Sequence, residues 1–110
     1  MIDVRIIINN DKIINELKIS GHSNYDRYGK DIVCAAVSIL VYTAYLSLKK
    51  IPDIKTKYVD DKESIYLSVE NYVKEMEGEI RGITIYLVAG LTLLSEKYKE
   101  NVKLDLIEKK

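Results

Sequence analysis

The sequence lacks many of the residues that usually build cores and functional sites. Its 110 residues include no phenylalanine or tryptophan, so tyrosine supplies all the aromatic surface, and they include one cysteine and one histidine. A lone cysteine cannot form an internal disulfide, and together with a lone histidine it cannot supply the roughly four ligands of a zinc site. No Walker pattern or other glycine-rich phosphate loop occurs. We therefore expect no metal, no cofactor and a reducing, cytoplasmic compartment.

The chain also lacks a net charge, because 17 lysine and arginine residues balance 17 aspartate and glutamate residues. No strong field would draw it to nucleic acid or to an anionic membrane, and we expect neither as a direct partner. The N-terminus, MIDVRIIIN, carries an early acidic residue and does not resemble a secretory signal. The longest apolar stretch, Ile32 to Leu48, is shorter than the roughly 20 residues that span a bilayer, so it predicts a buried helix.

The hydrophobic pattern predicts five strands and two helices in one domain of residues 1–110. The predicted strands are Val4–Asn9, Ile13–Ile19, Ile54–Val59, Ser64–Glu70 and Val102–Ile107, and the predicted helices are Asp31–Lys49 and about Gly78–Lys99. Polar turns join the first two strands and the next two as hairpins. The order ββ-α-ββ-α-β therefore predicts an α+β domain in which two helices pack on a mostly antiparallel sheet.

The segment before the first helix is predicted to be an irregular loop. Residues Ser20–Lys30 show no apolar periodicity and contain Gly21 and Gly29, which we expect to act as hinges. Tyr25 and Tyr28 are weaker candidates for lining a substrate pocket, because exposed loop tyrosines are common. A loop of this length is typical of a functional or mobile segment.

One pair of residues carries recognisable chemistry, namely Cys34 and His22. If Asp31 caps the first helix, Cys34 lies at its third position, where unpaired backbone N–H groups and the helix dipole stabilise a thiolate. An imidazole from the preceding loop could take the thiol proton and later protonate a leaving amine, and the helix start could supply oxyanion donors. Taken from the residues alone, a packed core cysteine and a solvated histidine are the commoner case.

The residues around this pair strengthen the catalytic interpretation. Gly21-His22, then Gly29, then the run DIVCAAVS from Asp31 to Ser38 resemble the ribosomal-processing cysteine protease family, Prp. Overall length and element order also fit that family. The resemblance implies that His22 and Cys34 are the catalytic pair. Ser23 stands where we would expect alanine, a small-for-small change that removes no catalytic position.

Two further residues of this motif are candidates for supporting roles. Asp31 either caps the helix or orients His22. Ser38 lies four residues after Cys34 on the same helical face, where its hydroxyl could hydrogen-bond near the thiolate or to the Cys34 carbonyl. The residues leave both alternatives open.

The resemblance implies a cysteine endopeptidase that removes the short N-terminal extension of a large-subunit ribosomal protein during bacterial ribosome assembly. The alternatives are a non-catalytic binding module of ribosome assembly and, more weakly, a single-cysteine redox sensor. The first predicted helix is apolar on nearly all sides, so a sheet, a second helix or another subunit must cover it. That feature and the resemblance both favour a homodimer.

Overall fold

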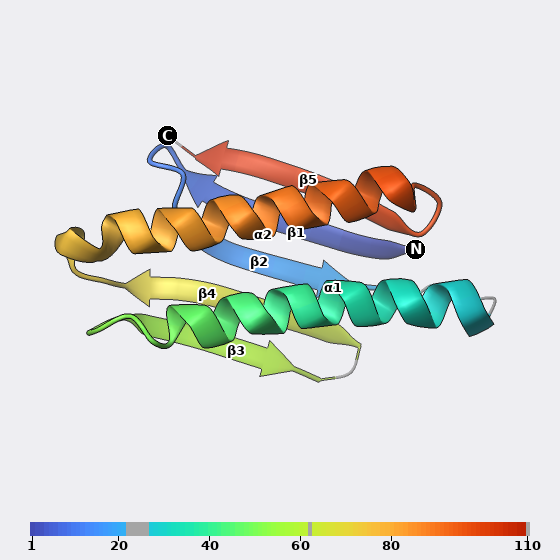
Figure 1. Ribbon diagram of the computed structural model, residues 1–110, viewed down its shortest axis with the longest axis horizontal. Helices are drawn as coiled ribbons and strands as arrows, with labels where there is room; N and C mark the ends of the chain where they lie inside the picture. Colours follow the sequence, from blue (N-terminus) through green and yellow to red (C-terminus); the bar gives the residue numbers. More distant parts are fainter. Residues whose placement is uncertain (22–26, 62, 110) are drawn as a thin grey trace.

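The chain folds into one five-stranded sheet with two long helices. The computed structural model describes residues 1–21, 27–61 and 63–109, with the backbone alone for residues 27–31. The elements are β1 (Ile2–Asn9), β2 (Ile14–Ser20), α1 (Arg27–Leu48), β3 (Lys55–Asp60), β4 (Ser64–Asn71), the 3-10 helix η1 (Lys74–Met76), α2 (Glu77–Lys97) and β5 (Val102–Lys109). The predicted order ββ-α-ββ-α-β is confirmed (Figure 1).

The strands pair in the order β3-β4-β2-β1-β5. The pairs β1–β2, β2–β4 and β3–β4 are antiparallel, whereas β1 and β5 run parallel. The prediction of a mostly antiparallel sheet is therefore confirmed, and the parallel pair makes the sheet mixed. Parallel strands cannot be joined by a tight turn, and α2 makes the crossover that brings β5 to the edge beside β1.

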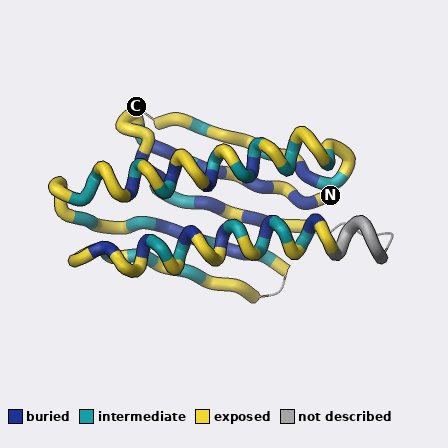
Figure 2. The backbone as a smooth tube through the Cα atoms, viewed as in Figure 1, coloured by how far each residue is buried: buried dark blue, intermediate teal, exposed yellow. Residues whose placement is uncertain are grey.

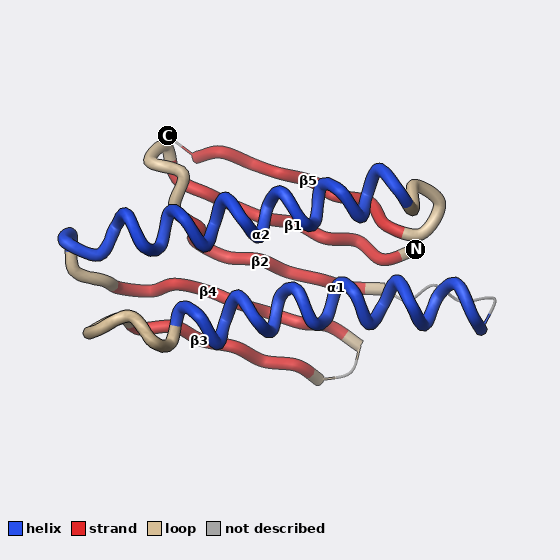
Figure 3. The backbone as a smooth tube through the Cα atoms, in the orientation of Figure 1, coloured by secondary structure: helices blue, strands red, loops and turns tan. Residues whose placement is uncertain are grey.

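Both helices cover the same face of the sheet and lie side by side, running in opposite directions (Figures 1 and 3). The α1 crossover moves the chain from β2 across β4 to β3, and the α2 crossover moves it from β4 the other way to β5. Because β2 and β4 are antiparallel, right-handed crossovers in these two opposite directions place both helices on one face. The result is a two-layer molecule.

The core lies between the sheet and the inward sides of the helices. Alternate residues of β1 are buried, and α1 and α2 bury side chains at three- and four-residue spacing (Figure 2). The helical residues buried in this way are Val33, Val37, Val41, Ala44, Leu48, Ile80, Thr84, Leu87 and Leu91. Strand residues are buried with a period of two and helix residues with a period of 3.6 against the same layer. The hydrophobic pattern of the sequence has the same periods, and it therefore located these elements.

The first helix begins earlier than predicted, at Arg27 instead of Asp31. Residues 27–30 have no apolar face, and the sequence therefore predicts a loop there. A helix end that projects beyond the sheet does not need an apolar face. A single glycine within a helix costs only about 1 kcal/mol, so Gly29 does not prevent the extension. Asp31 therefore lies inside α1 and is not its N-terminal cap, and Gly29 lies in the helix instead of in the predicted loop.

Leu40 of α1 packs closely against Gly90 of α2. A Cβ atom added to Gly90 of α2 would lie 2.6 Å from Leu40 Cδ2 of α1, so the end of the Leu40 side chain would have to shift to admit one. A Cβ added to Gly78 or Gly82, toward the other end of α2, would meet nothing within 4 Å. Space beside the start of α2 is therefore open at these two positions.

One buried hydroxyl joins α2 to the hairpin of β1 and β2. The Thr84 hydroxyl donates to the Ile80 carbonyl at 2.9 Å and accepts from the Ile14 backbone N–H at 3.2 Å. Replacing Thr84 by valine keeps the shape but leaves the buried Ile14 N–H without its acceptor. We expect the free energy of unfolding to fall by about 1–3 kcal/mol in a urea titration.

The matched control is Thr92→Val on the same helix, where the side chain is only half-buried. Its effect should stay within about 0.5 kcal/mol. Equal losses in the two variants would contradict the role given to the Thr84 hydroxyl.

Candidate active site

Cys34 lies on α1 where that helix crosses the end of the sheet. It is a free cysteine of intermediate burial, next to the fully buried Val33, and packs against the core. It also lines a cavity of about 320 Å³. Cys34 is thus neither sealed in the core nor fully exposed, and a substrate entering this cavity would reach its side chain.

The cavity forms where four strands begin or end. Its apolar walls come from β1, β2, β4 and α1, and its polar rim from the turn between β3 and β4 and from α1. The lining residues are Ile2, Ile19, Gly21, Cys34, Val37, Ser38, Asp60, Glu63, Ser64 and Ile65. Register explains part of this assembly, since Ile19 pairs with both Val4 and Ile65, and Ser20 pairs with Ser64.

Three predicted site residues meet in this cavity: Gly21, Cys34 and Ser38. No hydrogen bond joins the Ser38 hydroxyl to another residue in the part of the chain that the structure describes, so both roles considered for it stay predictions. His22 and Tyr25 lie outside the described residues, as do the side chains of Tyr28 and Asp31. The role of Asp31 in orienting His22 therefore also stays a prediction.

Gly21 adopts a conformation that favours glycine. Its φ is +85°, and a Cβ atom there would press into the carbonyl oxygen of Met1. Both constraints act on the residue that precedes His22 in the sequence. The direction of the backbone after β2 is therefore fixed by Gly21, which has a left-handed conformation and packs against the start of β1.

The earlier start of α1 changes the expected electrostatics of Cys34. Cys34 follows Arg27 by seven positions (34 minus 27), which is about two turns into the helix. The unpaired N–H groups and the positive end of the dipole belong to the first turn only. The prediction that a helix start stabilises the Cys34 thiolate and supplies oxyanion donors beside it is therefore wrong for this backbone.

The turn between β3 and β4 is held by Asp61. One carboxylate oxygen of Asp61 accepts from the Ser64 N–H at 2.8 Å, the Glu63 N–H at 3.1 Å and the Ser64 hydroxyl at 3.1 Å. These bonds, led by the Ser64 N–H, lower the pKa of Asp61, because each favours the charged form. These bonds tie Glu63 and Ser64 to Asp61 beside the cavity.

This arrangement predicts a loss of stability in acid. Asp61 has a lower pKa folded than unfolded, so its contribution is present above the unfolded pKa and disappears as pH falls through the folded pKa. Carboxyl NMR titration should place the Asp61 pKa below its ordinary value, and Ser64→Ala, which removes one donor, should move it back toward that value. An unchanged Asp61 pKa in that variant would contradict the assignment.

Sequence reasoning missed Asp60 and Glu63 as residues of the cavity. Asp60 begins the Asp60-Asp61-Lys62 segment and Glu63 directly follows it, and this segment predicts only a turn. The two residues lie 26 and 29 positions beyond Cys34 (60 minus 34 and 63 minus 34). Nothing in their local pattern separates them from other turn carboxylates. Only the pairing of β2 with β4 brings this turn to the end of the sheet that Cys34 overlies.

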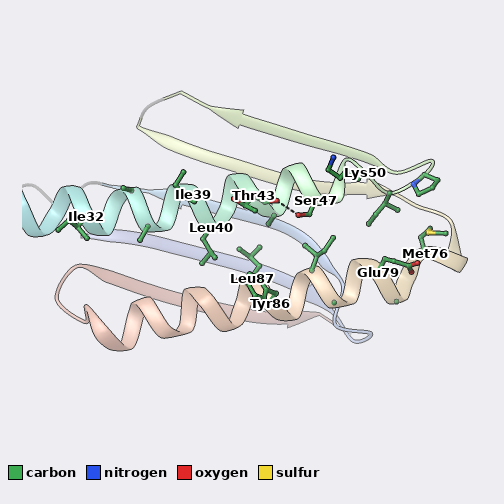
Figure 4. Close-up of a pocket in the computed structure, with 18 residues that line it drawn as sticks. Ile32, Ile39, Leu40, Thr43, Ser47, Lys50, Met76, Glu79, Tyr86 and Leu87 are labelled. Carbon is green, nitrogen blue, oxygen red and sulfur yellow. Dashed lines mark hydrogen bonds between the residues drawn. The ribbon is translucent and has the colours of Figure 1, made fainter.

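A second and larger hollow of about 1270 Å³ lies between α1 and α2 (Figure 4). Ile32, Ile39 and Leu40 of α1 and Tyr86 and Leu87 of α2 contribute to its mostly apolar lining. Its described lining contains no cysteine or histidine. We therefore place the chemistry in the smaller cavity, which holds Cys34.

Comparisons with known proteins identify the family of the chain. Residues 1–103 match the family model described as cysteine protease Prp. The ribosomal processing cysteine protease Prp of Staphylococcus aureus is 28% identical over 109 residues, which cover 96% of this chain and 98% of that protein.

Solved structures share the fold. The essential ribosomal processing protease Prp from S. aureus in complex with a substrate peptide superposes with a TM-score of 0.78 at 23% identity, covering 96% of this chain and 99% of that one. The same protease with a covalently linked product peptide gives a TM-score of 0.77 at the same identity and the same coverage.

The fold, the family match and a free cysteine open to a cavity together define a cysteine peptidase. Among cysteine peptidases, the chain belongs to the cysteine protease Prp family.

Proposed function

We propose that this protein is the cytoplasmic endopeptidase that removes the N-terminal extension of a large-subunit ribosomal protein during bacterial ribosome assembly. The observation that carries the proposal is Cys34, a partly buried free thiol that opens into a cavity at the end of the sheet. The matching relative is named a ribosomal processing protease, and the related structures contain substrate and product peptides. The whole chain, residues 1–110, would act as one protease domain.

The proposed chemistry uses Cys34 as nucleophile and His22 as its base. The thiolate attacks the scissile carbonyl carbon, and the proton taken by His22 passes to the leaving amine as the C–N bond breaks. Water, deprotonated by His22, then attacks the thioester, releases the carboxylate product and restores the thiol. The cycle needs no metal or cofactor.

The cavity suits an apolar peptide segment. Four aliphatic residues, Ile2, Ile19, Val37 and Ile65, form its inner walls. The family resemblance implies an extension that ends in apolar and aromatic residues, and such side chains would be buried against these walls. Gly21 also lines this cavity.

Co-expression tests the function directly. The enzyme is produced together with a large-subunit ribosomal protein carrying its N-terminal extension, and the mass of that protein is measured. The mass should fall by the mass of the extension when the wild-type enzyme is present and should remain full-length without it. An uncleaved substrate in the presence of folded wild-type enzyme would refute the proposal.

We also propose that the protein is a homodimer joined through its helical layer. The outward sides of both helices expose large apolar side chains that the described part of the chain does not cover: Ile32, Ile39, Tyr42, Leu46, Ile85, Tyr86 and Leu93. Ile39 is 65% exposed and Tyr86 75% exposed. The sheet covers the inner side of α1, and α2 covers its lateral side. Of the three candidates named from the sequence, a second subunit therefore remains to cover the outer side.

The charges at the hollow between the helices are compatible with a second copy. Lys50 and Glu79 both line it, so a twofold axis could bring each lysine near the partner copy's glutamate. Residues 74–97 are also long and apolar enough to cross a membrane, but α2 packs Ile80, Leu87 and Leu91 into the core. We favour a protein partner over a lipid one for this surface.

Sedimentation at micromolar concentration should give a dimer for the wild type and a monomer for Ile39→Glu. The control is Val59→Glu, which changes a residue that is 45% exposed on the β3 edge strand. It should leave the dimer intact. A wild-type monomer at all concentrations would contradict the proposal.

A further inference from the structure

The rim of the Cys34 cavity is acidic. Asp60 and Glu63 both line it, and the described lining contains no lysine or arginine. The chain as a whole is neutral, so these carboxylates are a local feature of the described lining. It lies beside the nucleophile of the reaction proposed above.

Glu63 is held at this rim by its backbone. Its N–H donates to the Asp61 carboxylate, and the Asp61 N–H donates to the Ser64 carbonyl at 3.1 Å, which closes the turn. Asp61 uses one carboxylate oxygen for these turn contacts and does not line the cavity. Glu63 is exposed, and its carboxylate makes no hydrogen bond or ion pair with another residue of the described chain.

Asp60 places a second negative charge near the same cavity. Asp60 is the last residue of β3. Burial is the main cause that raises the pKa of Tyr58, and the charge of the Asp60 carboxylate raises it further. Tyr58 packs against Tyr45 of α1, with ring centroids 4.7 Å apart, so this end of β3 is anchored under the helix. The end of β3 that carries Asp60 is therefore packed against α1.

The apolar walls and the acidic rim make different demands on a ligand. The walls favour aliphatic or aromatic side chains, whereas an exposed, unpaired carboxylate beside them favours a cation. A peptide that presented only apolar residues would leave Glu63 without a partner. A long cationic side chain satisfies both, because its methylene stem can lie along the isoleucines while its charge reaches the rim.

We propose that Glu63 determines specificity by pairing with a lysine or arginine side chain of the substrate peptide near the scissile bond. This inference rests on the proposed peptidase function. It assigns Glu63 a role in substrate choice and none in the bond-breaking step. Removing its charge should therefore alter the ranking of substrates and leave the chemistry intact.

The experiment uses peptides that span the cleavage junction of the extended ribosomal protein. Each peptide carries either lysine or glutamine at one position near the scissile bond, and kcat/KM is measured for every pair. The wild type should prefer lysine at one or more positions, and Glu63→Gln should lower that preference by about two- to fivefold, the range expected for a solvent-exposed ion pair. High salt should weaken the wild-type preference in the same direction.

Two further variants sharpen the test. Glu63→Lys should reverse the preference, so that a peptide with glutamate at the selected position is cleaved faster than its lysine counterpart. Glu75→Gln removes an exposed carboxylate from η1, just before α2 and at the opposite end of the molecule from the β3–β4 turn (Figure 1). It should retain the wild-type preference.

The outcomes separate this inference from the proposed function. If the wild type cleaves the peptides but shows no lysine preference, or if Glu63→Gln slows all peptides equally, the specificity role is overturned while the peptidase function stands. If the folded wild type cleaves no junction peptide and no extended protein, the proposed function itself fails.

Discussion

Cys34→Ala should abolish cleavage of the extended ribosomal protein while leaving the protein folded and able to bind its substrate. The substitution removes the sulfur that would form the thioester, so the two-step route is lost. Loss of a catalytic nucleophile commonly lowers kcat by several orders of magnitude, down to about 10⁻⁶ of the wild-type value. The measurement is the mass of the substrate after incubation, together with the dissociation constant for an uncleaved peptide.

The matched variant is Cys34→Ser, which keeps the shape and a weaker nucleophile and should also be inactive. Thermal unfolding serves as the fold control, because Cys34 packs against the core and its truncation costs some stability. In the wild type, iodoacetamide should alkylate Cys34 in the folded protein, whereas a packed core thiol would react only on unfolding. Retained turnover by Cys34→Ala would exclude the proposed mechanism.

Gly21→Ala should reduce kcat/KM by about tenfold or more with a smaller effect on global stability. Alanine at φ +85° costs about 1–2 kcal/mol, and its Cβ would also collide with the Met1 carbonyl. Relief of that strain requires the backbone leaving β2 to move, and His22 is the next residue. A displacement of the base by about 1 Å is enough for a large loss of rate.

The control for Gly21→Ala is Ser20→Ala, which changes the preceding exposed residue without strain. It should stay near the wild type. The rate of Cys34 alkylation adds a second readout, because a displaced His22 would slow thiolate formation even where the fold is intact. Activity within about twofold of the wild type for Gly21→Ala would show that this glycine does not position the loop.

The sequence predicted most of the secondary structure because its signals are local. The alternation in β4 and the three- and four-residue spacing in α2 reflect burial against one layer, so both elements were located to within about two residues. The start of α1 was misplaced because residues 27–30 show no apolar periodicity in the sequence. Hydrophobic periodicity cannot reveal a helical turn that lacks it.

Taken alone, the sequence determined the element order, the class of fold and the candidate nucleophile. Cys34 is the only cysteine, and it lies in a motif that resembles one family. Those features depend on residue identity and on periods of two and 3.6, which can be read along the chain.

Only the tertiary structure decided what surrounds that cysteine. The pairing of β2 with β4 and the crossover through α1 bring Glu63 to the rim of the Cys34 cavity. The start of α1 at Arg27 places Cys34 two turns inside the helix. The same packing turns the outer sides of both helices away from the sheet, leaving Ile39 and Tyr86 exposed. These relations join residues distant in sequence, and they follow from how the whole sheet assembles, which no local pattern encodes.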